Sequence, residues 1–128
     1  MGKKKFANQI DLKVAVIGDE DTVAGFCLAG VGQRDGQGNS NFLVVDSKSK
    51  RSDIEDAFRS FTLRKDTGVI VLNQHIAEDI RPALKEYAST GQVIPTVLEI
   101  PSKDHPYDPK KDALMQRVQV FFGANLSL

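Results

Sequence analysis

Blocks of apolar residues alternate with amphipathic segments along this chain, and the alternation predicts buried strands separated by helices. Four short continuous apolar runs are typical of strands that are buried on both faces of a sheet. These runs cover residues 14–17, 42–46, 69–72 and 96–100. Between them, apolar residues recur at helical spacing, as Ile54, Phe58 and Phe61 do. The pattern predicts an α/β fold: a four-stranded, open, parallel sheet of strand order 2-1-3-4, with helices on both faces.

Several residues mark where the predicted helices begin and end. Asp19 is a cap candidate for the helix after the first strand, and Gly30 ends that helix. Ser52 or Asp53 can cap the second helix. Pro82 interrupts the third helical segment, because a proline inside a helix removes a backbone hydrogen bond. The sequence therefore predicts either a kink or two short helices there, the second with Pro82 at its first position.

The last part of the chain predicts a stiff loop followed by a helix. Residues 100–109 contain three prolines, each of which restricts its own backbone and that of the residue before it. Asp108 followed by Pro109 is typical of the first turn of a helix. The chain thus divides into a basic N-terminal extension (residues 1–12), an α/β domain (residues 13–100), and a proline-rich linker with a C-terminal partner-binding helix (residues 101–128).

The predicted C-terminal helix carries an apolar stripe. A helix of about 13 residues is marginal by itself in water, so its apolar face must be covered by something. A partner helix or coiled coil is the favoured cover, and this domain's own sheet edge is the alternative. The predicted partner-binding residues, including two from the loop, are Leu114, Val118, Phe121, Phe122, His105 and Tyr107.

Composition narrows the classes of partner. The chain has 128 residues, with 17 basic and 17 acidic side chains, so its formal net charge of +0 argues against nucleic acid. A single cysteine, Cys27, excludes an internal disulfide and points to a reducing compartment. No apolar run approaches the ~20 residues that cross a bilayer, so the sequence predicts no direct membrane insertion. We expect a cytosolic or cytosol-facing protein.

Acidic side chains would line the crevice where strand order reverses, the usual ligand site of such a sheet. Asp19, Glu20 and Asp21 follow the first strand, and Asp46 ends the second. Carboxylates there could bind Mg²⁺, as in a receiver-like signalling domain, which is the alternative function. However, the third strand of this chain leads into Asn73. In a receiver domain, the third strand ends in the aspartate that accepts the phosphoryl group. Helix capping explains the acidic cluster, and the sequence predicts no metal, no cofactor and no catalytic residue.

Glycines in the first third of the chain do not form a nucleotide-binding motif. They close a predicted helix and do not connect a strand to one, as a dinucleotide fingerprint requires. Residues 33–41 are glycine-rich and polar, which predicts a mobile contact loop. The predicted contact residues of this loop are Gln33, Arg34, Asp35, Gln37 and Asn39.

Two stretches of the sequence resemble the family of F subunits of the eukaryotic vacuolar-type proton-pumping ATPase. They are residues 17–26 (IGDEDTVAGF) and residues 99–108 (EIPSKDHPYD). Between them, in the expected order, stand residues 42–48 (FLVVDSK) and residues 54–58 (IEDAF). The resemblance spans roughly residues 13 to 122, and the second stretch is long and unusual enough to be specific.

The resemblance implies a non-catalytic subunit in the central rotor stalk of the peripheral ATPase sector, on the cytoplasmic face of vacuolar or endosomal membranes. Its partners would be the coiled-coil D subunit and other subunits of that sector, with Leu114, Val118, Phe121 and Phe122 facing the D subunit. The loop of residues 33–41 would make a transient contact with a regulatory subunit. Besides the receiver-like domain, a soluble adaptor whose last helix folds back on its own sheet stays open as an alternative.

Overall fold

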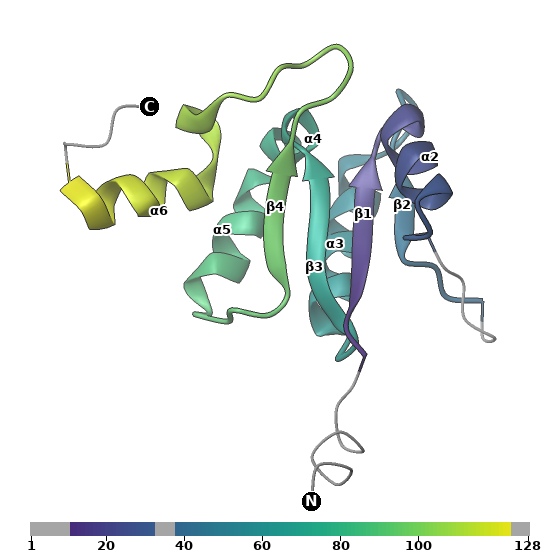
Figure 1. Cartoon of the computed structure of the whole chain (residues 1–128), viewed down its shortest axis with the longest axis horizontal. Helices are drawn as coiled ribbons and strands as arrows, with labels where there is room; N and C mark the ends of the chain where they lie inside the picture. Colours follow the sequence, from purple (N-terminus) through teal and green to yellow (C-terminus); the bar gives the residue numbers. More distant parts are fainter. Residues whose placement is uncertain (1–10, 33–37, 124–128) are drawn as a thin grey trace, which may run out of the picture.

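The computed structural model describes residues 11–32 and 38–123. Four parallel strands form one sheet in the order β2-β1-β3-β4, which confirms the predicted topology (Figure 1). The elements are β1 (Lys13–Gly18), α2 (Glu20–Leu28), β2 (Phe42–Val44), α3 (Arg51–Leu63), β3 (Thr67–Asn73), α4 (Gln74–Asp79), α5 (Arg81–Ser89), β4 (Thr96–Ile100), the 3-10 turn η1 (Pro109–Lys111) and α6 (Ala113–Phe122).

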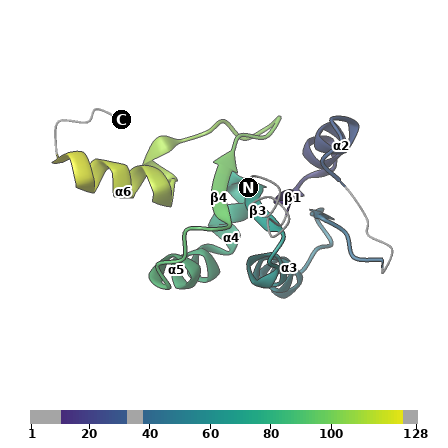
Figure 2. The ribbon, with the colours of Figure 1, turned by 60° about the horizontal axis from the view of Figure 1, so that its bottom comes forward.

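Helices cover the two faces of the sheet unequally. Helix α2 lies on one face, whereas α3 and α5 lie on the other, and α6 extends away from the sheet beyond β4 (Figure 2). The main core forms between the sheet and α3, α4 and α5. Its fully buried side chains include Ile17, Ile70 and Leu72 of the strands, and Phe58 and Ile76 of the helices. In the part of the chain that the structure describes, no helix combines the length and hydropathy needed to cross a bilayer.

All four predicted strands form, with differences at their ends: β1 is one residue longer at each end than predicted, and β3 begins two residues earlier and ends one residue later. Strand β4 has the predicted bounds, but β2 ends at Val44, two residues before the predicted end. The side chain of Asp46 turns the chain, since its carboxylate accepts a hydrogen bond from the Lys48 amide at 2.8 Å. The Asp46 amide in turn donates to the Ser49 hydroxyl at 3.0 Å. Such side-chain bonds to the local backbone compete with strand pairing.

The helix starts agree with the predictions at some positions and differ at others. Asp19 caps α2, as predicted, by accepting a hydrogen bond from the Thr22 amide at 2.8 Å. The predicted cap of α3 at Ser52 or Asp53 is wrong, because the turn after β2 brings the chain into the helix already at Arg51, behind Lys50. Helices α4 and α5 are two short helices, as expected, but Pro82 occupies the second position of α5, not the first.

The predicted start of the last helix is also wrong. Asp108 and Pro109 begin only the turn η1, where the Asp108 carboxylate accepts a hydrogen bond from the Lys110 amide at 3.0 Å. Helix α6 begins four residues later, at Ala113, with Asp112 as its cap. The Asp112 carboxylate accepts from the Leu114 amide at 2.9 Å. Asp108 and Asp112 can both cap a helix, and it is Asp112 that caps α6.

Gly18 ends β1 beside a buried side chain, and its lack of a Cβ atom permits that approach. A Cβ atom built at Gly18 would lie 2.8 Å from the Asn73 Oδ1 atom, closer than real contacts allow. We expect Gly18→Ala to lower the free energy of unfolding by about 1–3 kcal/mol in a urea titration. Gly25→Ala is the matched control, because the same atom at Gly25 in α2 meets nothing within 4 Å. That variant should gain up to ~1 kcal/mol, and equal effects of the two would contradict this explanation.

Candidate functional site

The crevice beyond the carboxyl ends of β1 and β3 is filled by a hydrogen-bond network centred on Asn73. The Asn73 side chain is fully buried, and its Oδ1 atom accepts from the Asp19 amide at 2.9 Å. Its Nδ2 atom donates to the Thr22 hydroxyl at 3.1 Å and to the Pro101 carbonyl at 3.2 Å. The side chain therefore joins the end of β1, the start of α2 and the chain leaving β4.

The proline-rich loop is held against this edge at further points. The buried Gln74 amide group exchanges two hydrogen bonds of 2.7 Å with the backbone of Asp108, one as donor and one as acceptor. His105 stacks on His75 with ring centroids 4.1 Å apart and an angle of 18° between the rings. The His105 Nδ1 atom lies 3.1 Å from the Ser102 hydroxyl. Residues 101–108 are thus fastened to β3 and α4 at both ends and in the middle.

Charged groups around the histidine stack set the electrostatics of this edge. Burial lowers the pKa of His75, and the neighbouring His105 lowers it further. For Asp19, burial opposes ionisation, yet hydrogen bonds from Thr22 and the two histidines lower its pKa. Among the described residues, no group of three or more His, Cys, Asp or Glu side chains is placed to hold a metal ion.

The lowered pKa of His75 predicts a dependence of stability on pH. The unfolded chain binds a proton at this histidine more readily than the folded chain does, so the free energy of unfolding should fall as pH drops from about 7.5 to 5.5. The charged groups that face His75 are His105, which opposes its protonation, and Asp19, Asp79 and Glu78, which favour it. Urea titrations across this range should show a shallower fall for His75→Gln. A fall of unchanged slope in that variant would contradict the assignment to His75.

Helix α6 presents the predicted apolar stripe to solvent. All of α6 is described, and none of its residues is buried. Phe121 is 83% exposed and Phe122 61% exposed, and their rings pack edge to face with centroids 5.2 Å apart. Leu114 is 41% exposed, and Val118 is half-buried. The stripe is thus not covered by the chain's own sheet in this structure.

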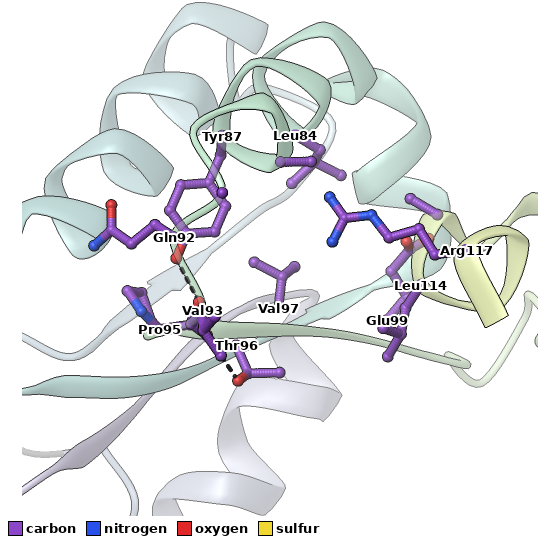
Figure 3. Close-up of a pocket in the computed structure, with 13 residues that line it drawn as sticks. Leu84, Tyr87, Gln92, Val93, Pro95, Thr96, Val97, Glu99, Leu114 and Arg117 are labelled. Atoms are coloured by element: carbon purple, nitrogen blue, oxygen red, sulfur yellow. Dashed lines mark hydrogen bonds between the residues drawn. The ribbon is translucent and has the colours of Figure 1, made fainter. Parts of the chain in front are cut away.

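Beside the stripe, a groove of about 230 Å³ lies between α5, β4 and α6 (Figure 3). Its lining is mostly apolar and includes Leu84, Tyr87, Val93, Val97, Leu114 and the side chain of Arg117. A half-buried ion pair lies at one wall, where both terminal nitrogens of Arg81 donate to the Glu99 carboxylate at 2.9 Å. Burial raises the pKa of Glu99, and the hydrogen bonds from Arg81 oppose that shift.

The structure relates the predicted partner-binding residues to this groove in different ways. Leu114 lines it, and Val118, Phe121 and Phe122 continue along α6. His105 instead stacks on His75, and the Tyr107 hydroxyl donates a hydrogen bond to the Asp112 carboxylate that caps α6. The two loop residues therefore hold the linker and the start of α6 in place. Burial raises the pKa of Tyr107, and its bond to Asp112 acts in the same direction.

In the predicted contact loop, Gln33, Arg34, Asp35 and Gln37 lie outside the described residues, and Asn39 is exposed ahead of β2. Sequence reasoning missed the groove residues of α5 and β4. It also missed Arg117 of α6, whose side chain lines the groove. The available signal was the apolar pair Val93 and Ile94 just after Gly91, where a loop is usually polar.

Comparisons with known proteins agree on one family. The family model for the ATP synthase (F/14-kDa) subunit matches residues 14–118. The F subunit of the V-type proton ATPase of Dictyostelium discoideum is 59% identical over 112 residues, which cover 88% of this chain and 91% of that protein. The corresponding F subunit of Homo sapiens is 50% identical over 111 residues, covering 87% of this chain and 91% of the human protein.

A solved structure supports the same relationship. The crystal structure of the F subunit of the V-type ATP synthase from Archaeoglobus fulgidus superposes with a TM-score of 0.53 at 27% sequence identity. It covers 70% of this chain and 98% of the archaeal one. The fold, the sequence matches and the family model together lead to one conclusion: this chain belongs to the family of V-type ATPase F subunits.

Proposed function

We propose that the chain is a non-catalytic rotor-stalk subunit of a V-type proton ATPase that binds the coiled-coil D subunit through α6 and the adjoining groove. The observation that carries this proposal is the apolar stripe of α6, in which no residue is buried and both phenylalanines are exposed. In the complex it would couple ATP hydrolysis in the peripheral sector to proton translocation. It would lie on the cytoplasmic face of vacuolar or endosomal membranes.

The chemistry of the surface favours a helical partner. The stripe and the groove lie side by side and share Leu114, so one apolar helix could contact both (Figure 3). Burying the two phenylalanines, Leu114 and Val118 contributes about 1.5–3 kcal/mol for each side chain, before the cost of ordering α6. A coiled coil carries apolar residues along its whole length, so it can contact the stripe of α6 from Leu114 to Phe122.

Transmission of torque also requires that α6 keep a fixed position relative to the sheet. The fastenings of residues 101–108 supply this, since Asn73 and Gln74 hold the linker to β3 and α4. Tyr107 then connects the linker to the cap of α6 through Asp112. A side load on α6 is thereby passed to the sheet through hydrogen bonds and a proline-restricted backbone.

Several features support a role in binding without chemistry. The crevice that holds the ligand in related sheet folds is occupied here by the Asn73 side chain and covered by the linker. Other subunits of the peripheral sector are further partners in this proposal. The loop of residues 33–41 is proposed to contact a regulatory subunit transiently.

A binding titration tests the proposal. The full chain should form a one-to-one complex with the purified D subunit of the same ATPase, measured by isothermal titration calorimetry and analytical ultracentrifugation. Adding Mg²⁺ with a small-molecule phosphodonor should leave the melting temperature of the chain unchanged. A failure to bind the D subunit, together with a saturable shift on adding Mg²⁺ and the phosphodonor, would favour the receiver-like alternative.

A further inference from the structure

Arg117 stands out in the groove because its charge has no partner among the residues that the structure describes. Its guanidinium points from α6 into the space between Leu84 of α5 and Val97 of β4 (Figure 3). Within residues 11–32 and 38–123, no carboxylate pairs with Arg117 and no hydrogen bond holds it. In the free chain this costs little, because the side chain is exposed and hydrated.

Glu99 is the carboxylate in the lining of the groove, and it and two acidic groups of the neighbouring elements already have partners. Glu99 is bound by Arg81, and its side chain is only 3% exposed. Glu86 of α5 lies 3.8 Å from Arg59 of α3. Asp112 is buried as the cap of α6 and accepts the hydroxyl of Tyr107. Among the residues described, these carboxylates all have partners, so none of them is left free to compensate the charge of Arg117.

More positive charge lies along the same side of the groove. Lys85 of α5 and Lys110 of η1 line an adjoining hollow, and neither forms an ion pair with a described residue. Lys111 beside them lies 3.3 Å from Glu78. The groove thus joins an apolar lining to an uncompensated basic side.

Covering the stripe of α6 would take water away from Arg117. A guanidinium buried without an acceptor is costly, whereas a carboxylate can accept two parallel hydrogen bonds from it. A neutral carbonyl would satisfy one donor and leave the charge uncompensated. A partner that removes water from Arg117 is therefore better matched when it places an acidic group at this position, next to the apolar contacts.

We propose that the helix filling this groove carries an aspartate or glutamate that binds Arg117, with further acidic residues on its flank facing Lys85 and Lys110. This inference rests on the proposed binding of the D subunit and specifies the chemistry of the helix that the D subunit contributes. The apolar stripe would supply most of the affinity, which any apolar helix could obtain. The ion pair with Arg117 would fix the position of the partner helix along the groove.

The test compares dissociation constants for the full chain and the purified D subunit at low and high salt. Arg117→Met keeps the aliphatic volume and removes the charge, and it should weaken binding about tenfold to a hundredfold at low salt. Arg117→Lys should recover part of the loss, because it keeps the charge but not the planar fork. Lys65→Met, which removes an exposed charge between α3 and β3, should bind as the parent does. The salt dependence should be weaker for Arg117→Met than for the parent.

Two results would overturn the inference, and each is separable from failure of the proposed function. Parent-like affinity and salt dependence of Arg117→Met would show that the guanidinium stays hydrated at the rim. Equal weakening by Lys65→Met would show a general charge effect. In both cases the parent chain still binds the D subunit, whereas a parent chain that does not bind contradicts the proposed function itself. If Arg117→Met has the same melting temperature as the parent chain, misfolding is excluded as the cause of weaker binding.

Discussion

Replacing Val118 and Phe121 together with aspartate is expected to abolish binding to the D subunit. Both side chains lie on the exposed stripe of α6, and neither contributes to the buried core. The double change removes the apolar contact of two side chains and places two carboxylates where the partner would exclude water. Loss of about 1.5–3 kcal/mol for each contact, with the cost of burying charge in addition, predicts a weakening of at least ~100-fold. Co-purification and calorimetry would measure it.

A matched control comes from the same helix. Val120 is also 83% exposed, but it projects from the other side of α6 from Val118, so Val120→Asp should change affinity less than about fivefold. The double variant should still unfold cooperatively at the parent's temperature, because the sheet core does not depend on α6. Binding that survives the double change would show that the stripe is not the interface.

Replacing Asn73 with alanine is expected to cause the largest loss of stability. The change leaves the Asp19 amide, the Thr22 hydroxyl and the Pro101 carbonyl without their buried partner. Unsatisfied buried groups and the cavity together predict a loss of about 2–4 kcal/mol in a urea titration. Residues 101–108 should also exchange their amide hydrogens faster, since one fastening of the linker is gone.

The control for this variant is Gln92→Ala. Gln92 is an exposed amide whose Nε2 atom donates to the Ile94 carbonyl at 2.8 Å in a loop. Its replacement should cost less than about 1 kcal/mol, because water can satisfy the released carbonyl. A comparable cost for both variants would mean that the Asn73 network does not hold the sheet edge and the linker together.

The strands and their order were predictable because burial on both faces leaves a strong mark in the sequence. Residues 96–100 form β4 with the predicted bounds, and the two helices around Pro82 follow from the missing backbone donor of proline. Boundaries set by local competition were less predictable. Asp108 and Asp112 are both good caps in isolation, and the hydrogen bond from Tyr107 to Asp112 accompanies the choice of the second.

The site was predictable only in part, for a physical reason. The apolar residues of the α6 stripe recur at helical spacing within one segment of the chain, so the sequence alone reveals them. The Asn73 and Gln74 fastenings join side chains to backbone groups 28 and 34 residues away, and backbone partners leave no mark in the sequence. The position of Arg117 in the groove was not predictable, because a helical periodicity does not show that α5 and β4 form the opposite wall of a groove.

The unequal covering of the sheet gives the groove its position. The sheet ends at β4, and α6 extends outward from it (Figure 1), so the groove forms between β4, α5 and α6. In this proposal the partner completes the edge of the domain, and the linker keeps α6 at the right distance.

Amide hydrogen exchange of the full chain, alone and bound to the D subunit, tests the central claim most directly. In the free chain α6 should exchange rapidly, because it has no buried residue. In the complex, exchange should slow at least ~10-fold across α6 and at residues 84–97, and stay unchanged in α2 on the opposite face. Protection confined to α2 and β2, with α6 exchanging as fast as before, would contradict the account.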